Sequence, residues 1–176
     1  IYNNSAGYHT YDKKIPVVDS DVYDLASLTK ILGTLPLVME LVDKNELSLD
    51  MQLSQLLPGF ADSNKKQMNL KQMLSHYARL KPWIPFYRYT FDDEKGGPSP
   101  DYYRDEGVKG FNTQVAKDLF IRDDIRDSIM NIINVSDLNK KLEYRYSDLP
   151  YYLLKRYLEN IYGASLQFLT QSHFYE

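Results

Sequence analysis

The chain has 176 residues, of which 43% are hydrophobic and 26% charged, a composition typical of one globular domain and not of a disordered or fibrous chain. Its net charge of −3 and its scattered lysines and arginines give no basic stripe, which argues against nucleic acid as a partner. No cysteine is present, which excludes disulfides and thiolate chemistry, and the three histidines form no H-x-x-x-H pair, so we expect no metal site and no cofactor.

The first predicted element is a β-hairpin near the N-terminus. Two β-prone pieces, "GYHTY" (7–11) and "IPVV" (15–18), flank a turn-prone Asp-Lys-Lys. The first residues lack the basic-then-apolar order of a signal peptide, and no apolar run approaches the length of a membrane span. The sequence therefore begins as if it were cut from something larger.

A long helix is predicted from Leu28 to Val42, because its apolar residues recur at the i, i+3, i+4 spacing of one helical face. Pro36 lies inside this pattern, and we expect it to kink the helix rather than end it. Two shorter helices should follow. One is stopped by Pro58-Gly59, and the other covers "NLKQMLSHYARL" (69–80), with an apolar face formed by Leu70, Met73, Leu74 and Tyr77.

Residues 80–112 are predicted to form a long irregular loop. The stretch 81–110 holds four of the eight prolines and four of the eight glycines, with aromatic residues between them. Loops of this length inside a compact domain are usually functional or mobile. Helical spacing returns at Ile125–Ile133 and again from Leu153 to Ile161, where Gly163 should end the helix before a last helical segment.

The candidate chemistry rests on two S-x-x-K matches. Ser63 and Lys66 lie in a polar run, where a lysine in water keeps its pKa near 10.4 and is a poor base. Ser27 and Lys30 lie at the start of the most apolar helix, where burial would lower the pKa of the lysine and the helix N-terminus favours a developing alkoxide. The alternative that Ser27 and Lys30 form an ordinary helix start with no catalytic role stays open here. Serine is a common first residue of a helix, and lysine often reaches out to solvent.

A third residue strengthens the first match. Tyr146-Ser147-Asp148 follows about 120 residues later and resembles the Y-x-N element that accompanies S-x-x-K in penicillin-recognising serine enzymes. A tyrosine near a lysine can be kept partly ionised and relay a proton from serine to the leaving group.

Several stretches in the same order resemble the serine β-lactamase and penicillin-binding-protein superfamily, in its class C β-lactamase, D-alanyl-D-alanine carboxypeptidase and esterase branch. They are residues 23–60, "NLKQMLSHYARLKPW" (69–83) and "YRYSDLPYYLLKRYLE" (144–159). The segment "LKPWIPFY" (80–87) resembles such domains fused to bacterial family 3 glycoside hydrolases.

The resemblance implies an α+β, β-lactamase/transpeptidase-like fold, of which this chain is an N-terminal, mainly helical portion with a short hairpin. It implies Ser27 as the acylated nucleophile and as one oxyanion donor through its backbone N–H. Lys30 would then be the proton acceptor, Tyr146 the proton shuttle and Asp148 a substrate-binding residue.

Three departures from the family pattern bear on this reading. Asp148 stands where asparagine is common, Tyr77-Ala78-Arg79 replaces Thr-Ser-Gly after His76, and no K-T-G or H-x-G follows Tyr146. In the family that last element lies on a strand that supplies the second oxyanion donor. We therefore expect residues 1–176 to be a partial domain that is nearly inactive alone.

The function expected from the resemblance is acyl-enzyme hydrolysis of D-alanyl peptides, β-lactams or small esters, with a peptidoglycan-derived or other small substrate. The alternative is a non-catalytic module of the same fold that binds cell-wall peptide or sugar. The resemblance also implies a periplasmic or cell-envelope location and a linked glycoside hydrolase domain. An unpaired strand edge in a partial sheet leaves homo-oligomer formation open.

Overall fold

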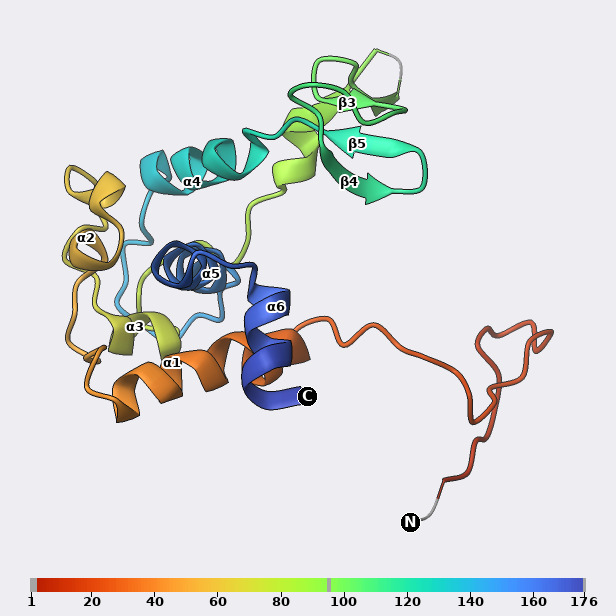
Figure 1. Cartoon of the computed structure of the whole chain (residues 1–176), viewed down its shortest axis with the longest axis horizontal. Coiled ribbons are helices and arrows are strands. Elements are labelled where there is room, and N and C mark those ends of the chain that lie inside the picture. The colour runs from red at the N-terminus through yellow and green to blue at the C-terminus, as the bar shows by residue number, and fades with distance from the viewer. Residues whose placement is uncertain (1–2, 95, 176) are drawn as a thin grey trace.

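The computed structural model describes residues 3–94 and 96–175 (Figure 1). The α-helices are α1 (Leu35–Asp43), α2 (Leu53–Leu56), α3 (Leu70–Leu74), α4 (Ile125–Val135), α5 (Leu149–Tyr162) and α6 (Leu166–Thr170). The π-helices are η1 (Lys30–Thr34) and η4 (Gln171–Tyr175), and the 3₁₀-helices are η2 (Pro58–Phe60) and η3 (Phe86–Thr90). The strands are β1 (Phe91–Asp92), β2 (Gly97–Pro98), β3 (Tyr103–Arg104), β4 (Thr113–Ala116) and β5 (Leu119–Ile121).

The hydrophobic core lies among the helices, with α5 surrounded by α1, α3, α4 and α6 (Figure 1). The side chains of Leu37, Leu53, Leu70, Leu149 and Leu158 are completely buried in it. Because α5 contacts η1 as well as α4 and α6, it fixes the start of the first helix against the rest of the core. The predicted helices around 125–133 and 153–161 are confirmed as α4 and α5, and Gly163 ends α5 with a φ of 65°.

The first helix runs through Pro36, as predicted, but changes from a π-helix to an α-helix at Leu35. Proline has no N–H to donate to the carbonyl of Leu32, four residues earlier. That carbonyl instead accepts a hydrogen bond from the hydroxyl of Tyr175, at 2.7 Å. The C-terminal segment thus supplies the donor that Pro36 lacks.

The helix predicted over 69–80 is shorter than its pattern suggests. It has a capping box, in which Asn69 accepts from the backbone of Gln72, but α3 ends at Leu74. His76 and Arg79 both have φ near +60°, a left-handed conformation that a helix cannot contain. Tyr77 therefore lies beyond the helix, and its predicted place on the apolar face is wrong.

The region that includes 80–112 contains short elements that the sequence did not predict. In it η3, β1, β2 and β3 follow one another, and β3 joins β4 and β5 in an antiparallel sheet of order β3-β5-β4. Tyr103 and Thr113 both pair with Ile121, and a bulge lies between Gln114 and Ala116. This sheet lies at one end of the molecule, beyond α4 and away from α1 (Figure 1).

The predicted N-terminal pairing is present as a single antiparallel bridge between Tyr8 and Pro16. The flanking backbone bonds run from His9 to Ile15 and from Val17 to Gly7. The segment extends away from the helices, and most of its side chains are exposed (Figure 1). The architecture is mixed α+β, with helices and small antiparallel sheets.

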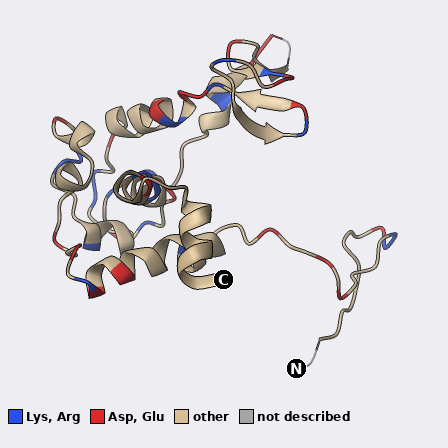
Figure 2. Cartoon of the chain, viewed as in Figure 1, with Lys and Arg blue, Asp and Glu red and all other residues tan. Residues whose placement is uncertain are grey.

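Acidic and basic residues are scattered along the ribbon in Figure 2, with both signs present in the helical part and in the part that carries the strands. No helix in the described part of the chain is long and apolar enough to cross a membrane.

Candidate active site

Ser27 lies in the turn that leads into η1, directly before the helical residues. Successive turn bonds, from Leu28 N to Leu25 O and from Lys30 N to Ser27 O, wind the chain into the helix. Ala26 has a φ of 44°, an uncommon value for a residue with a Cβ. This uncommon backbone conformation lies directly before Ser27, and such conformations are often found at functional sites.

The hydroxyl of Ser27 receives two hydrogen bonds. The Lys30 amine donates one at 2.9 Å, across a single helical turn, and the Tyr146 hydroxyl donates the other at 3.1 Å. The structure therefore brings Tyr146 next to Ser27 and Lys30, although Tyr146 follows Ser27 by 119 positions in the sequence. The Ser27 backbone N–H has no acceptor within residues 3–94 and 96–175, which leaves it free to face a ligand.

Tyr146 is held in place by His76. The two rings lie with centroids 4.6 Å apart, and His76 Nδ1 accepts a bond from the backbone N–H of Ser147 at 3.3 Å. Burial and the charge of Lys30 keep the pKa of His76 below its usual value, which agrees with a neutral imidazole that accepts at Nδ1. The sequence singled out His76 only through the resemblance, and its contact with Tyr146 could not be foreseen from spacing.

Asp148 contacts the same lysine from the start of α5. Its Oδ1 lies 2.7 Å from Lys30 Nζ, and its backbone N–H donates to Pro82 O at 2.8 Å. The neighbouring Ser147 Oγ donates to Lys81 O at 2.7 Å and caps the N–H of Leu149. These backbone bonds fix the loop that carries Tyr146 and Asp148 against the segment that begins at Lys81.

The electrostatics of Lys30 differ from the expectation. Its side chain is only 15% exposed, and burial by itself would lower the pKa. Hydrogen bonds to Asp148 and Tyr146 outweigh that effect and raise the pKa above its ordinary value, so the prediction of a lowered lysine pKa is wrong. The hydrogen bond with Ser27 and the nearby Lys30 amine lower the pKa of the Tyr146 phenol.

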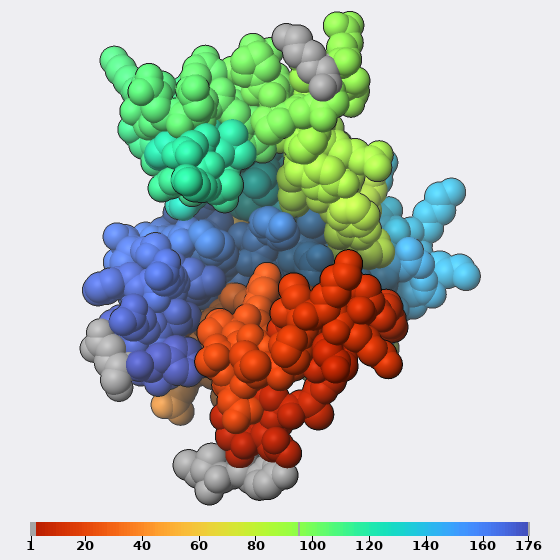
Figure 3. All heavy atoms as spheres, turned by 90° about the vertical axis from the view of Figure 1, so that its right-hand side faces the viewer, coloured from red at the N-terminus to blue at the C-terminus, as the bar shows by residue number. Residues whose placement is uncertain are grey.

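A pocket of about 380 Å³ lies beside these groups, between the first helix and α5. Ser27, Lys30 and Asp148 line one part of it, and Tyr151, Tyr152 and Lys155 continue along α5. The face shown in Figure 3 has the orange atoms of the early chain next to the blue atoms of the C-terminal helices. No group of three or more histidine, aspartate or glutamate side chains in the described part of the chain could hold a metal ion.

The second S-x-x-K match lies in water only in part: Lys66 is exposed, as expected, but Ser63 and the intervening Lys65 are buried. Ser63 is 8% exposed and Lys65 only 1%. Lys65 Nζ donates to Asn64 Oδ1 at 2.7 Å, to Asn134 O at 3.2 Å and to Ser136 O. All three ammonium protons are therefore used, and two of them join this loop to the end of α4, a structural role that fits no nucleophile pair.

The fold described above is of the serine hydrolase type. The chain belongs to the beta-lactamase family, whose family model matches residues 1–175. It is related to Bacillus subtilis penicillin-binding protein 4*, with 25% identity over 114 residues. It is also related to an N-acetylmuramyl-L-alanine amidase of the same organism, with 28% identity over 161 residues.

These matches cover 63% and 88% of this chain but only 24% and 31% of the relatives, so the chain spans about a quarter to a third of their length. Among solved structures, a class C β-lactamase from Rhodobacter sphaeroides superposes with a TM-score of 0.62 at 16% identity, over 97% of this chain and 38% of that one. EstCE1, described as a hydrolase with promiscuous acyltransferase activity, gives 0.61 at 25% identity, over 98% and 42%. Both likenesses agree with the fold described above.

Proposed function

We propose that this chain carries the nucleophilic half of a serine hydrolase that acts through an acyl-enzyme on D-alanyl peptides, β-lactams or small esters. The observation that carries the proposal is the position of Ser27 Oγ, within hydrogen-bond reach of both Lys30 Nζ and Tyr146 OH. A nucleophile, a proton acceptor and a proton relay at such distances are the parts that acyl transfer requires.

In the proposed reaction the Ser27 oxygen attacks the carbonyl carbon as its proton passes to the Lys30–Tyr146 pair. Tyr146 then delivers that proton to the departing nitrogen or oxygen, and an ester on Ser27 remains. Water then attacks the carbonyl carbon of this ester and gives a proton to the Lys30–Tyr146 pair, the carboxylic acid product leaves, and the same proton returns to the Ser27 oxygen. The Ser27 backbone N–H is free to donate to the oxyanion, while Lys30 stabilises the tyrosinate form of Tyr146.

We further propose that residues outside 1–176 complete the domain and provide the second oxyanion donor. The short share of the relatives' length that this chain covers supports the idea. So does the first helix, on which four large apolar side chains are 40% exposed or more: Leu28, Ile31, Leu32 and Met39. Loss of one oxyanion donor typically slows such enzymes about a hundredfold or more, so residues 1–176 alone should turn over slowly.

The second candidate is a binding module that keeps the fold without turnover. The Lys30–Asp148 contact favours it, because a lysine with a raised pKa is a poorer proton acceptor. A cell-envelope location and a linked glycoside hydrolase stay predictions from the sequence resemblance, and a homo-oligomer stays a prediction from the unpaired strand edge. One structural neighbour, a penicillin-binding protein homologue from Pyrococcus abyssi, is octameric, and this is a property of that protein.

Hydrolysis of p-nitrophenyl butyrate separates the two candidates. The catalytic proposal expects release of nitrophenol above the rate of Ser27→Ala, with a butyryl ester on Ser27 as the intermediate. The binding module expects equal, background rates for both proteins. A matched control is Ser54→Ala, which removes the hydroxyl of an α2 serine that lies outside the pocket.

A further inference from the structure

The pocket next to Ser27 contains a second lysine that the proposed chemistry does not use. Asp148, Tyr152 and Lys155 follow one another at i, i+4 and i+7 on α5, and all three line this pocket. Seven residues of helix correspond to about 10 Å along its axis. Lys155 therefore lies about that far along the groove from the end that holds Lys30.

The hydrogen bonds of Lys155 leave donors available. Within the described part of the chain its amine donates to one acceptor, Glu159 Oε1, at 2.6 Å. By contrast, Lys30 contacts both Ser27 and Asp148, and Lys65 uses all three of its protons. An ammonium has three N–H groups, so two of those on Lys155 are not used by the protein.

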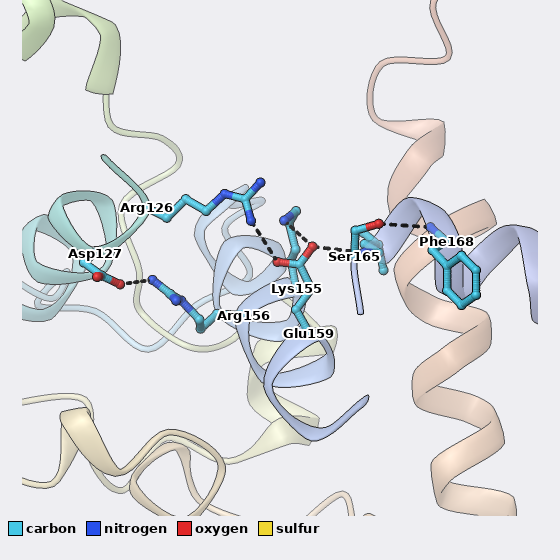
Figure 4. A network of polar contacts seen from close by, with 8 residues as sticks. Arg126, Asp127, Lys155, Arg156, Glu159, Ser165 and Phe168 are labelled. Atoms are coloured by element: carbon cyan, nitrogen blue, oxygen red, sulfur yellow. Dashed lines mark hydrogen bonds and ion pairs between the residues drawn. The ribbon is translucent and has the colours of Figure 1, made fainter. Parts of the chain in front are cut away.

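Glu159, which pairs with Lys155, also contacts two other groups. Glu159 Oε1 also accepts the backbone N–H of Leu166 at 2.9 Å, and Glu159 Oε2 lies 3.9 Å from Arg126 (Figure 4). Beside this group, Arg156 pairs with Asp127. The Arg156–Asp127 pair lines a different pocket, whereas Lys155 and Arg126 share the single carboxylate of Glu159, which leaves one positive charge in excess around that carboxylate.

Between the two ends the pocket is lined mainly by apolar and aromatic groups. Tyr151 and Tyr152 lie on the α5 side, Ala26 lies beside Ser27, and Leu166 borders the far end. Such a wall fits a hydrocarbon or other apolar spacer, while an ammonium with unused N–H donors in a pocket fits an anion.

We propose that Lys155 is a specificity-determining residue that binds an anionic group on the acyl side of the substrate, about 10 Å from the carbonyl that Ser27 attacks. The substrate class is an acyl compound with an apolar spacer that ends in a carboxylate or a similar anion. The inference rests on the proposed function for the identity of the reacting end, but the binding that it describes does not require turnover.

The test uses the 176-residue chain with Ser27→Ala, so that an ester stays intact. Monomethyl suberate has an ester at one end and a carboxylate at the other, and dimethyl suberate is its neutral counterpart. We expect the monoester to bind about fivefold more tightly, measured by NMR titration at low salt, the size of effect that one partly exposed ion pair gives. The preference should shrink as salt is added.

Lys155→Met should remove the preference, and Lys155→Arg should keep it, because the charge is the recognised feature. Lys44→Met is the matched control. Lys44 also pairs with a glutamate one helical turn away, Glu40, but it lies outside this pocket, so the preference should persist.

Equal binding of the two esters, no binding of either, or a preference that survives Lys155→Met would overturn the proposal. Failure of the proposed hydrolase function is a different result. It would be seen as the absence of a covalent adduct on Ser27 when the unsubstituted chain is exposed to a fluorophosphonate. A preference lost in Lys155→Met without such an adduct would support the anion subsite and contradict the hydrolase.

Discussion

The carboxylate of Asp148 lies 2.7 Å from the amine of Lys30, which also donates to the candidate nucleophile Ser27. This ion pair holds the lysine in its charged form, because Asp148 and Tyr146 raise its pKa although burial acts in the opposite direction. An asparagine at 148 would accept a hydrogen bond without the negative charge. Asp148 therefore sets the pH range in which Lys30 can accept a proton.

The first prediction concerns Asp148→Asn. Loss of the carboxylate should lower the pKa of Lys30, so the neutral amine becomes more abundant at a given pH. If Lys30 accepts the proton of Ser27, the rising limb of the acylation rate should move to lower pH, and the rate at pH 7 should increase. The measurement is the rate of labelling by a fluorophosphonate probe between pH 5 and pH 10.

Asp124→Asn serves as the control, because exposed Asp124 pairs with half-buried Arg122 outside the pocket and should leave the profile unchanged. A profile that does not move in Asp148→Asn would show that Lys30 acts only as a fixed cation.

The second prediction concerns Tyr146→Phe. The ring would keep its contact with His76, but the hydroxyl that donates to Ser27 would be lost. General acid–base groups typically contribute about a hundredfold to ten-thousandfold, so turnover of an ester should fall by that order while ligand affinity changes little. The measurement is kcat and KM for p-nitrophenyl butyrate in the intact parent domain.

Tyr144→Phe is the comparison for this experiment. Tyr144 also contacts His76, at 6.0 Å and edge-on, but it makes no hydrogen bond to Ser27 and should keep full activity. Equal activity of Tyr146→Phe and the unsubstituted domain would remove the proposed proton relay.

The third prediction concerns stability and the buried Lys65. Lys65→Met would leave the carbonyls of Asn134 and Ser136 without this donor, at a cost of about 2 to 5 kcal/mol in unfolding free energy. Lys66→Met should cost far less, because that side chain is exposed. Urea denaturation followed by circular dichroism measures both, and similar midpoints for the two variants would contradict the structural role of Lys65.

Lys65 should also make stability depend on pH. Burial lowers its pKa to about 8, against about 10.4 in an unfolded chain. Between these values the unfolded chain binds more protons, so this contribution to stability is fully present above pH 10.4 and is lost as the pH falls through about 8. The Lys65→Met variant should lack this component of the pH dependence.

The helical part of the fold was predictable because its apolar residues have a clear period. The pattern at Ile125–Ile133 and Leu153–Ile161 located α4 and α5, and Gly163 marked the end of α5. The strands β1 to β5 were not predictable, since they are only two to four residues long and cannot show an alternating pattern.

The residues of the candidate site were predictable from the sequence, but the direction of the pKa shift of Lys30 was not. Spacing and resemblance selected Ser27, Lys30, Tyr146 and Asp148, which the structure brings together. The raised pKa of Lys30 depends on where Asp148 points, and the burial of Lys65 depends on α4, which is about 70 residues away in sequence. Both are tertiary contacts, on which local sequence patterns carry no information.

Mass spectrometry after exposure to a fluorophosphonate tests the central claim most directly. The account predicts one covalent adduct per chain, located on the peptide that contains Ser27. The adduct should be absent in Ser27→Ala, which loses one hydroxyl at a helix start and should remain folded, at a cost of at most about 1 to 2 kcal/mol. An adduct on another residue, or equal labelling of the folded Ser27→Ala chain, would contradict the account.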